Sequence, residues 1–177
     1  PNCSTIQLVM VLAPLHAANP IRRVHVSTYQ AVSGSGVKGL RQMEQERLGE
    51  PVEEPAYGYR IDQNCIAQCD SFQENGYTKE EMKVANETRK ILEIPDLLIS
   101  ATAVRVPVRR GHSEAVSIEF TRPISVGEVR EILGSSAGVV LVDEPGKGAV
   151  PTALESEGHD EVYVGRIRED LAVPGIG

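Results

Sequence analysis

The amino-acid sequence predicts an α+β fold, in which a mixed, largely antiparallel sheet is covered by helices. Helical and strand-like patterns alternate along the chain of 177 residues, a length that supports one well-packed domain. Two strand-like runs, 97–108 and 112–120, are joined only by Arg109, Arg110 and Gly111. This connection is too short for the crossover that a parallel pair needs, so we expect the two strands to be antiparallel. Helices packed against such a sheet complete the predicted architecture.

The first element is a helix with a cysteine at its start. Ile6, Val9, Leu12 and Leu15 recur at helical spacing, and Asn19-Pro20 ends the pattern. Cys3 therefore falls in the first turn, where free backbone N–H groups and the helix dipole favour a thiolate. A cysteine of lowered pKa is an activated nucleophile. From its position alone, a buried structural cysteine is an equally good interpretation.

A strand at Val24–Gln30 and a second helix follow. Gly34-Ser35-Gly36 turns the chain into this helix, which Gly49 ends. Its apolar residues are predicted to share one side: Val37, Leu40, Met43 and Leu48. The stretch 50–77 contains Pro and Gly and has no sustained period, which indicates a loop with a short extended piece near 59–67.

Two capping boxes mark further helices. Thr78 with Glu81 opens a helix that runs to about Leu92, and Ser125 with Glu128 opens one that ends at Gly134. Strands at 138–142 and 161–168 complete the prediction. We expect the strands 24–30, 97–108, 112–120 and 161–168 to form one sheet, covered by the helices that begin near Cys3, Ser35 and Thr78.

Composition restricts the possible partners and compartment. The net charge is −7 and there is no basic block, which argues against nucleic acid as a partner. The sequence has no apolar run long enough to span a membrane and no signal peptide. Three cysteines, an odd number, suggest reduced thiols in a cytoplasmic protein. The chain begins at Pro1 and ends at Gly177 without a charged tail, so we expect one domain, 1–177, that is truncated at both ends.

Side-chain alternation places several polar residues on one face of the sheet. His112 shares the parity of Val116 and Ile118, and Gln30 shares that of Val24 and Val26. Both side chains are therefore positioned to meet a pocket, although a hydrogen-bonded, half-buried polar residue is the simpler interpretation of each.

Three charged residues have simple and functional interpretations. Arg105 has the opposite parity to its neighbouring valines and can project from the other face, or it is a solvated surface arginine. Glu80 and Lys83 are three residues apart on a helix, where they are either functional or a surface ion pair.

Two motifs suggest cofactors but lack their context. The stretch 34–39 matches G-x-G-x-x-G between a strand and a helix, yet no βαβ unit follows it, so a dinucleotide-binding fold is not expected. Cys65 and Cys69 have no second Cys or His pair nearby, so no metal site is expected.

Four segments together resemble the aspartate-semialdehyde dehydrogenase family, in order and at the family's spacings. They are Asn2-Cys3-Ser4-Thr5, 27–34 (STYQAVSG), 105–115 (RVPV followed by GHSEA) and 160–168 (DEV followed by VGRIR). The likeness covers almost the whole chain. It implies the catalytic and dimerisation domain, with the fold of the C-terminal domain of glyceraldehyde-3-phosphate dehydrogenase, and without the NADP-binding domain. The stretch 59–70 departs most from the family pattern, and Cys65 and Cys69 are unusual there.

The resemblance implies a role for each matching residue. Cys3 would be the nucleophile, His112 the acid/base, and Gln30 the residue that orients the reacting group. Arg105 would hold the substrate carboxylate and Glu80 its ammonium group. Lys83 and Asn2 would contact phosphate. The nicotinamide would lie against four residues: Ser33, Gly34, Ser35 and Gly36.

The implied reaction converts aspartyl phosphate into aspartate semialdehyde through a cysteine thioester, with NADPH as the hydride donor. The family serves biosynthesis of lysine (through diaminopimelate), threonine and methionine, and it forms homodimers or homotetramers. Because the hydride step needs the missing domain, we expect the chain alone to be inactive.

Three alternatives remain open from the residues. A related acyl-phosphate reductase, such as N-acetylglutamyl-phosphate reductase, would not need an acidic partner such as Glu80. A Cys–His hydrolase would need no nicotinamide. A non-catalytic interaction domain would need neither Cys3 nor His112.

Overall fold

The computed structural model describes residues 1–174. Its helices are α1 (Cys3–Ala18), α2 (Gly36–Leu48), α3 (Lys79–Ile91), α4 (Val126–Gly134) and α5 (Ala153–Ser156), with short 3₁₀ turns η1 (Val32–Ser35) and η2 (Pro145–Lys147). Its strands are β1 (Ile21–Gln30), β2 (Leu98–Arg105), β3 (Ser113–Phe120), β4 (Val139–Leu141) and β5 (Val162–Val164). We expected a truncation at both ends of the chain, and residues 175–177 at one of these ends lie outside the described residues.

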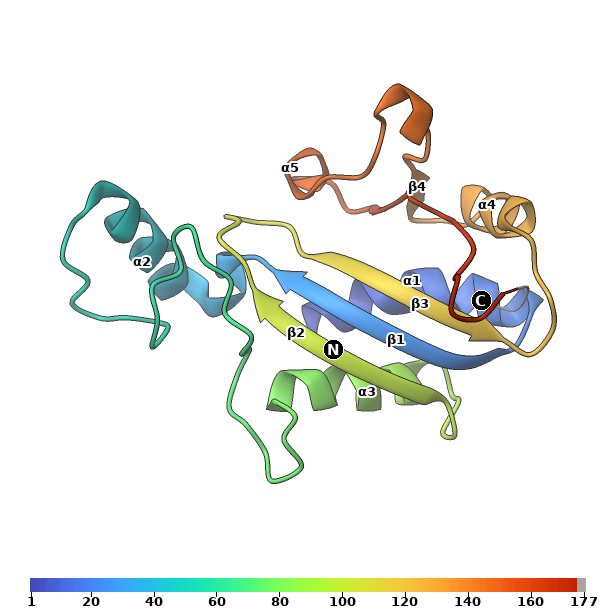
Figure 1. The fold of residues 1–177 in the computed structure, drawn as a ribbon, viewed down its shortest axis with the longest axis horizontal. Helices are drawn as coiled ribbons and strands as arrows, with labels where there is room; N and C mark the ends of the chain where they lie inside the picture. The colour runs from blue at the N-terminus through green and yellow to red at the C-terminus, as the bar shows by residue number, and fades with distance from the viewer. Residues whose placement is uncertain (175–177) are drawn as a thin grey trace.

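The main sheet has β1 at its centre, parallel to β2 and antiparallel to β3 (Figure 1). The predicted α+β fold with a mixed sheet is confirmed. β2 and β3 run in opposite directions, as expected, but they do not pair, because β1 lies between them. The connection after β2 crosses the end of β1, where Val106 N donates to Gln30 O at 3.0 Å and Val32 N donates to Val108 O at 2.9 Å.

The prediction of one sheet is wrong for the fourth strand. β5 pairs in parallel with β4 in a separate two-stranded sheet, which packs against α4. Among the three strand pairings of residues 1–174, one is antiparallel and two are parallel. The sheets are therefore mixed, with less antiparallel pairing than we expected.

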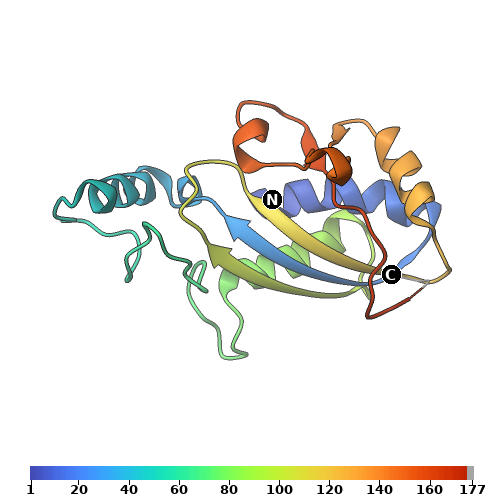
Figure 2. The ribbon, with the colours of Figure 1, turned by 45° about the horizontal axis from the view of Figure 1, so that its top comes forward.

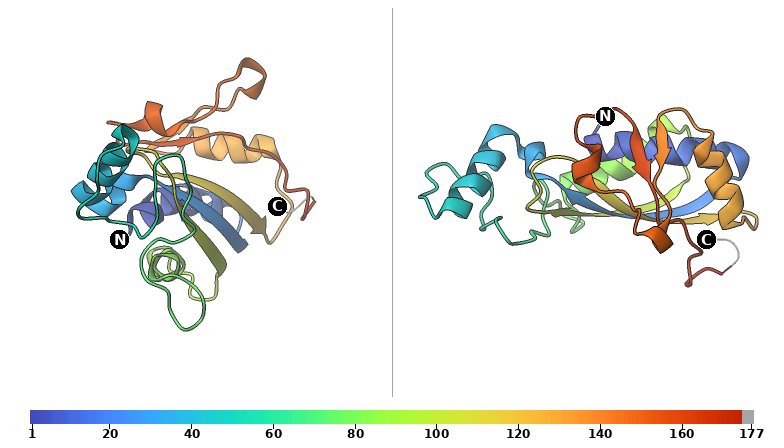
Figure 3. Two further views of the ribbon diagram at one scale, coloured as in Figure 1. Left: turned by 60° about the vertical axis from the view of Figure 1, so that its left-hand side comes forward. Right: turned by 90° about the horizontal axis from the view of Figure 1, so that it is seen from above.

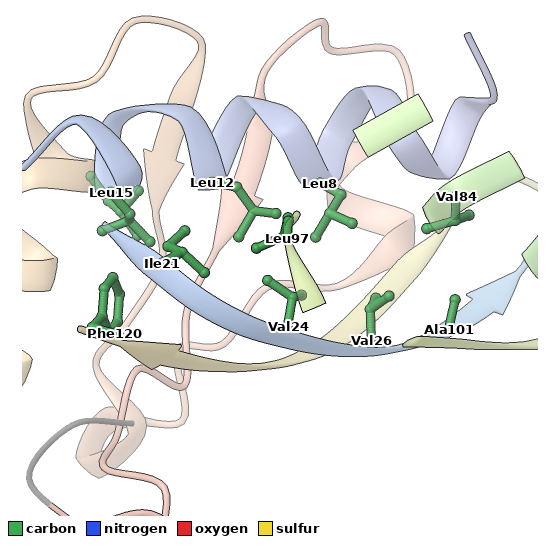
Figure 4. Packing of buried hydrophobic residues seen from close by; sticks show 11 residues of the cluster. Leu8, Leu12, Leu15, Ile21, Val24, Val26, Val84, Leu97, Ala101 and Phe120 are labelled. Carbon is green, nitrogen blue, oxygen red and sulfur yellow. The ribbon is translucent and has the colours of Figure 1, made fainter. Parts of the chain in front are cut away.

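The core lies between α1 and the sheet, and Figure 4 shows its buried hydrophobic side chains in a close view. Leu8, Leu12 and Leu15 of α1 pack on Val24 and Val26 of β1, and all five side chains are at most 2% exposed. Burying such a side chain contributes about 1.5–3 kcal/mol. This packing fixes the start of α1 relative to the end of β1.

α1 and α3 lie on the same face of the main sheet (Figure 3). α3 begins with the predicted capping box, in which the Thr78 hydroxyl and the Glu81 carboxylate each accept a backbone N–H. The predicted box of α4 at Ser125 and Glu128 is also present. These local hydrogen bonds determine where the two helices begin.

α2 does not cover the sheet, which corrects our expectation. With the loop that follows, it forms an arm beyond the ends of the strands (Figure 2). Val37 and Leu48 are 70% and 72% exposed, so they do not share a buried side with Met43. A polar residue anchors the loop instead, because Gln42 Oε1 accepts from the backbone N–H groups of Ala56 and Tyr57.

No helix within residues 1–174 is both long and apolar enough to cross a bilayer.

Candidate active site

Cys3 is the first residue of α1, and its sulfur meets the ring of His112. The Cys3 Sγ and His112 Nε2 atoms are 3.1 Å apart. Asn2 caps the helix, because its side-chain oxygen accepts from Ser4 N at 2.8 Å and from Thr5 N at 3.3 Å. The cap and the packing of α1 thus hold the thiol at the end of the sheet where His112 precedes β3.

His112 is held from two sides. Ala31 N donates to its Nδ1 atom at 3.0 Å, and Gln7 Nε2 donates to its backbone oxygen at 3.4 Å. Burial lowers the pKa of His112 below its ordinary value, and the positive charge of Arg105 acts in the same direction. Glu80 opposes both effects. The ring is therefore biased towards its neutral form.

The thiolate predicted at Cys3 is not favoured in this structure. Cys3 is exposed as a residue. Partial removal of its thiol from water nevertheless raises the pKa, and the negative charge of Glu80 raises it further. The backbone N–H of Ser4 lowers the pKa but does not reverse the shift. One reason is that the first-turn N–H groups of Ser4 and Thr5 already bond to the cap oxygen of Asn2.

Gln30 lies at the end of β1 and is 1% exposed. Its Nε2 atom is 3.2 Å from three acceptors, the hydroxyls of Ser4 and Thr28 and the Glu80 carboxylate. Gln30 thus connects β1 to the helices that carry Cys3 and Glu80. The parity argument placed this side chain on the correct face of the sheet.

Arg105 ends β2 directly beside Gln30 and is 6% exposed. Its Nη1 atom donates to Ala31 O at 2.8 Å, and its guanidinium lies 5.8 Å from the centre of the Tyr57 ring. The Nε atom is buried without a hydrogen-bond partner. A buried charged donor without a partner is costly, so this arrangement favours an anionic ligand.

Lys83 and Glu80 lie on α3 at the edge of the same region. Lys83 Nζ is 3.5 Å from Asp70 Oδ2 and 3.8 Å from Glu80 Oε2. The simple interpretation of an ion pair between Glu80 and Lys83 therefore holds alongside any role in binding. The Asn2 carboxamide oxygen serves the helix cap, which leaves its amide nitrogen for a ligand.

Two of the three glycines in the stretch 34–39, Gly34 and Gly39, allow close packing of the backbone. A Cβ atom at Gly34 would lie 2.8 Å from Arg105 Nη1 and 3.4 Å from the His112 ring. At Gly39 it would lie 2.6 Å from the Val32 carbonyl oxygen. Gly36 has φ +68° and open space around it. The motif thus brings a tight turn against the site, with Ser33 and Ser35 beside it.

Sequence reasoning missed four features of the site. Tyr57 lies beside Arg105, and the main chain of Ala31 binds both Arg105 and His112. Cys69 is a buried thiol whose pKa burial raises to about 11. Glu114 is a half-buried residue on the strand after His112, and its Oε1 atom is inaccessible to solvent. Tyr57 and Cys69 lie in an irregular loop that offers no periodic signal, whereas Glu114 shares the parity of His112 and could have been noticed.

Residues 1–174 contain no group of three or more His, Cys, Asp or Glu side chains arranged to hold a metal ion.

Cys3 in contact with His112, next to the buried Arg105 at the end of a mixed sheet, forms a thiol site beside a buried cation. A protein-family model, the semialdehyde dehydrogenase dimerisation domain, matches residues 12–176 of the chain. The chain belongs to this semialdehyde dehydrogenase family.

Curated relatives point to one enzyme within the family. The chain is 44% identical over 179 residues to aspartate-semialdehyde dehydrogenase of Legionella pneumophila, covering 98% of the chain and 52% of the relative. It is 46% identical over 183 residues to the enzyme of the same name from Bacillus subtilis, covering 97% of the chain and 53% of the relative. The chain thus spans about half the length of the curated relatives it matches.

Solved structures agree with this relationship. Aspartate-semialdehyde dehydrogenase II from Vibrio cholerae superposes with a TM-score of 0.90 at 42% identity, over 98% of this chain and 52% of that one. The same enzyme in complex with ASA superposes with a TM-score of 0.91 at 40% identity, over 99% of this chain and 53% of that one. The fold of the chain is therefore the fold of about half of each of these solved chains.

Proposed function

We propose that this chain is the catalytic and dimerisation domain of an aspartate-semialdehyde dehydrogenase. The observation that carries the proposal is the Cys3–His112 pair, 3.1 Å apart, beside an arginine with a buried, unpartnered Nε atom. In the proposed reaction the Cys3 sulfur attacks the acyl carbon of aspartyl phosphate. The bond from that carbon to phosphate breaks, phosphate leaves with the proton of the thiol, and a thioester remains on Cys3.

Arg105 is the proposed carboxylate-binding residue. Ala31 O already binds its Nη1 atom, whereas the buried Nε atom has no hydrogen-bond partner. Two N–H groups on one edge match the two oxygens of a carboxylate. This edge would hold the substrate while its acyl group sits at Cys3.

Each of the remaining side chains is proposed to bind a different polar group of the substrate. Glu80 would bind the ammonium group, and Lys83 and the Asn2 amide would bind phosphate. Gln30, fixed by Ser4 and Thr28, would orient the reacting carbonyl. His112 would supply hydrogen bonding and proton exchange at the sulfur.

The nicotinamide would lie against the turn at Ser33, Gly34, Ser35 and Gly36, where Gly34 brings the backbone close to Arg105 and His112. Among related structures, an aspartate semialdehyde dehydrogenase from Candida albicans was solved with NADP. When bound, NADPH would supply the hydride that converts the thioester to the semialdehyde. In the family that the chain resembles, a separate domain binds NADP, and that domain lies in the part of the relatives that this chain does not cover. We therefore expect the chain alone not to catalyse the reaction.

We also propose that the protein forms a homodimer and works in the cytoplasm, in the biosynthesis of lysine, threonine and methionine. The matched dimerisation domain supports the dimer. All three cysteines of the chain are free thiols, which supports a reducing compartment.

Kinetics of full-length protein carrying this chain test the proposal. Cys3→Ser should abolish semialdehyde-dependent reduction of NADP. His112→Ala should lower the rate by about 10²–10⁴-fold. Arg105→Lys should mainly raise KM, because lysine keeps the charge but loses the two-pronged grip. Glu74→Gln, at an exposed loop residue, is the control and should leave the rate unchanged. Full activity of Cys3→Ser would refute the proposal.

A further inference from the structure

The main chain of Ala31 contacts two residues of the site. Its N–H donates to His112 Nδ1 at 3.0 Å, and its carbonyl oxygen accepts from Arg105 Nη1 at 2.8 Å. Ala31 is fully buried and lies between the end of β1 and the start of η1. The two bonds hold the histidine and the arginine to one residue of the backbone.

The bond to His112 determines which ring nitrogen carries the proton. A backbone N–H can only donate, so His112 Nδ1 must present its lone pair. In a neutral imidazole the single proton then sits on Nε2. The Nε2 atom is the one that lies 3.1 Å from the Cys3 sulfur.

We propose that the Ala31 amide is a positioning group that holds His112 as the neutral Nε2–H imidazole, so that His112 is a hydrogen-bond donor to the Cys3 sulfur in the resting protein. It follows that the resting pair is not an ion pair of thiolate and imidazolium. A second proton could enter the ring only at Nδ1, where it would face the Ala31 N–H, so protonation must break that bond.

The charges around the ring are consistent with this arrangement. Arg105 on β2 opposes a second positive charge, whereas Glu80 on α3 favours one. Cys3 on α1 faces Nε2, and Glu114 lies two residues along from His112 with a pKa raised towards its neutral form. Burial and Arg105 together hold the pKa of His112 below its ordinary value in spite of Glu80.

The chain contains its own reference for the measurement. His16 Nδ1 accepts from Ile21 N at 3.0 Å, which is the same backbone arrangement at the far end of α1. His16 should therefore show the same tautomer without any contact to a thiol. His25 and His159 complete the set of four histidines.

Nitrogen-15 NMR of the chain, labelled at histidine, tests the proposal. The His112 signals are assigned by their loss in His112→Asn. At neutral pH we expect a bare Nδ1 and a protonated Nε2 at His112, the pattern also expected at His16. A protonated Nδ1, or two protonated nitrogens at neutral pH, would overturn the proposal.

A backbone change tests the Ala31 amide itself. Incorporating lactate in place of alanine at position 31 turns the amide into an ester and removes the N–H. We expect the proton of His112 to redistribute towards Nδ1 and its pKa to rise, with His16 unchanged. An unchanged His112 spectrum in the ester protein would overturn the proposal, and if that protein does not fold, the spectrum of the unaltered chain decides. Neither measurement uses substrate or nucleotide, so failure of the proposed reaction and failure of this proposal can be told apart.

Discussion

At the scale of single residues, Glu114 is a half-buried carboxyl that the proposed reaction does not use. It faces Thr28 across the β1–β3 ladder, and its Oε1 atom is buried without a partner. Burial raises its pKa to about 8, although a hydrogen bond from Gln7 acts in the opposite direction. The carboxyl is therefore protonated in the folded chain at a pH where it is ionised in the unfolded chain.

This difference predicts how stability depends on pH. Between the unfolded pKa near 4.5 and the folded value near 8, the folded state binds more protons, so stability falls as pH rises. The slope contributed by one such group is at most about 1.4 kcal/mol per pH unit. We expect Glu114→Gln to remove this contribution between pH 5.5 and 7.5, measured as the free energy of urea unfolding. An unchanged slope would show that Glu114 is ionised in the folded chain.

Cys3 illustrates how competing local effects decide a pKa. The start of a helix favours a thiolate, but burial and Glu80 raise the pKa of this thiol. A hydrogen bond from His112 would add to the backbone N–H of Ser4 in stabilising a negative sulfur.

At the scale of elements, the cap of α3 links stability to the site. α3 carries Glu80 and Lys83, and Thr78 caps its first turn with a side chain that is 1% exposed. Thr78→Ala should cost about 1 kcal/mol of unfolding free energy and should also raise KM in the full-length protein. Ser125→Ala removes the corresponding cap of α4, away from the site, and should lower stability without changing KM. An equal effect of both variants on KM would contradict this link.

Local sequence patterns predicted the helices and strands better than they predicted how the strands pair and where the helices pack. The capping boxes and the N-terminal helix are encoded within a few residues, and the sequence predicted all three. The β1–β2 pairing joins residues 75 positions apart, such as Gln30 and Arg105, and no local pattern encodes it. The arm of α2 was mispredicted because its anchor is the polar Gln42, whereas its apolar residues Val37 and Leu48 face outwards.

The site residues that follow a local pattern could be predicted from the sequence, and those that depend on the tertiary fold could not. Strand parity placed Gln30 and His112 on one face of the sheet and set Arg105 apart from its neighbouring valines, and helix position placed Cys3 in a first turn. The part played by Ala31 depends on its backbone, so its side chain gives no signal. Tyr57 and Cys69 reach the site from a loop whose path only the tertiary fold determines.

At the scale of the whole molecule, the face of the main sheet opposite α1 and α3 is the proposed dimer surface. It presents small and aromatic residues, including Ser27, Tyr29 and Thr102, and Tyr29 is 43% exposed. Thr102→Lys would place a charge in the middle of this face. We expect sedimentation at micromolar concentration to show a dimer for the unaltered chain and mostly monomer for Thr102→Lys. Leu154→Lys, at an exposed residue of α5, should remain dimeric. A monomeric unaltered chain would count against this surface.

Acylation of Cys3 is the most direct test of the account, because it requires the thiol site but no hydride donor. The chain would be incubated with β-aspartyl phosphate and examined by mass spectrometry. We predict one aspartyl group on Cys3, released by hydroxylamine, and no such label in Cys3→Ser. Labelling of Cys65 in place of Cys3, or an equal label in Cys3→Ser, would contradict the account.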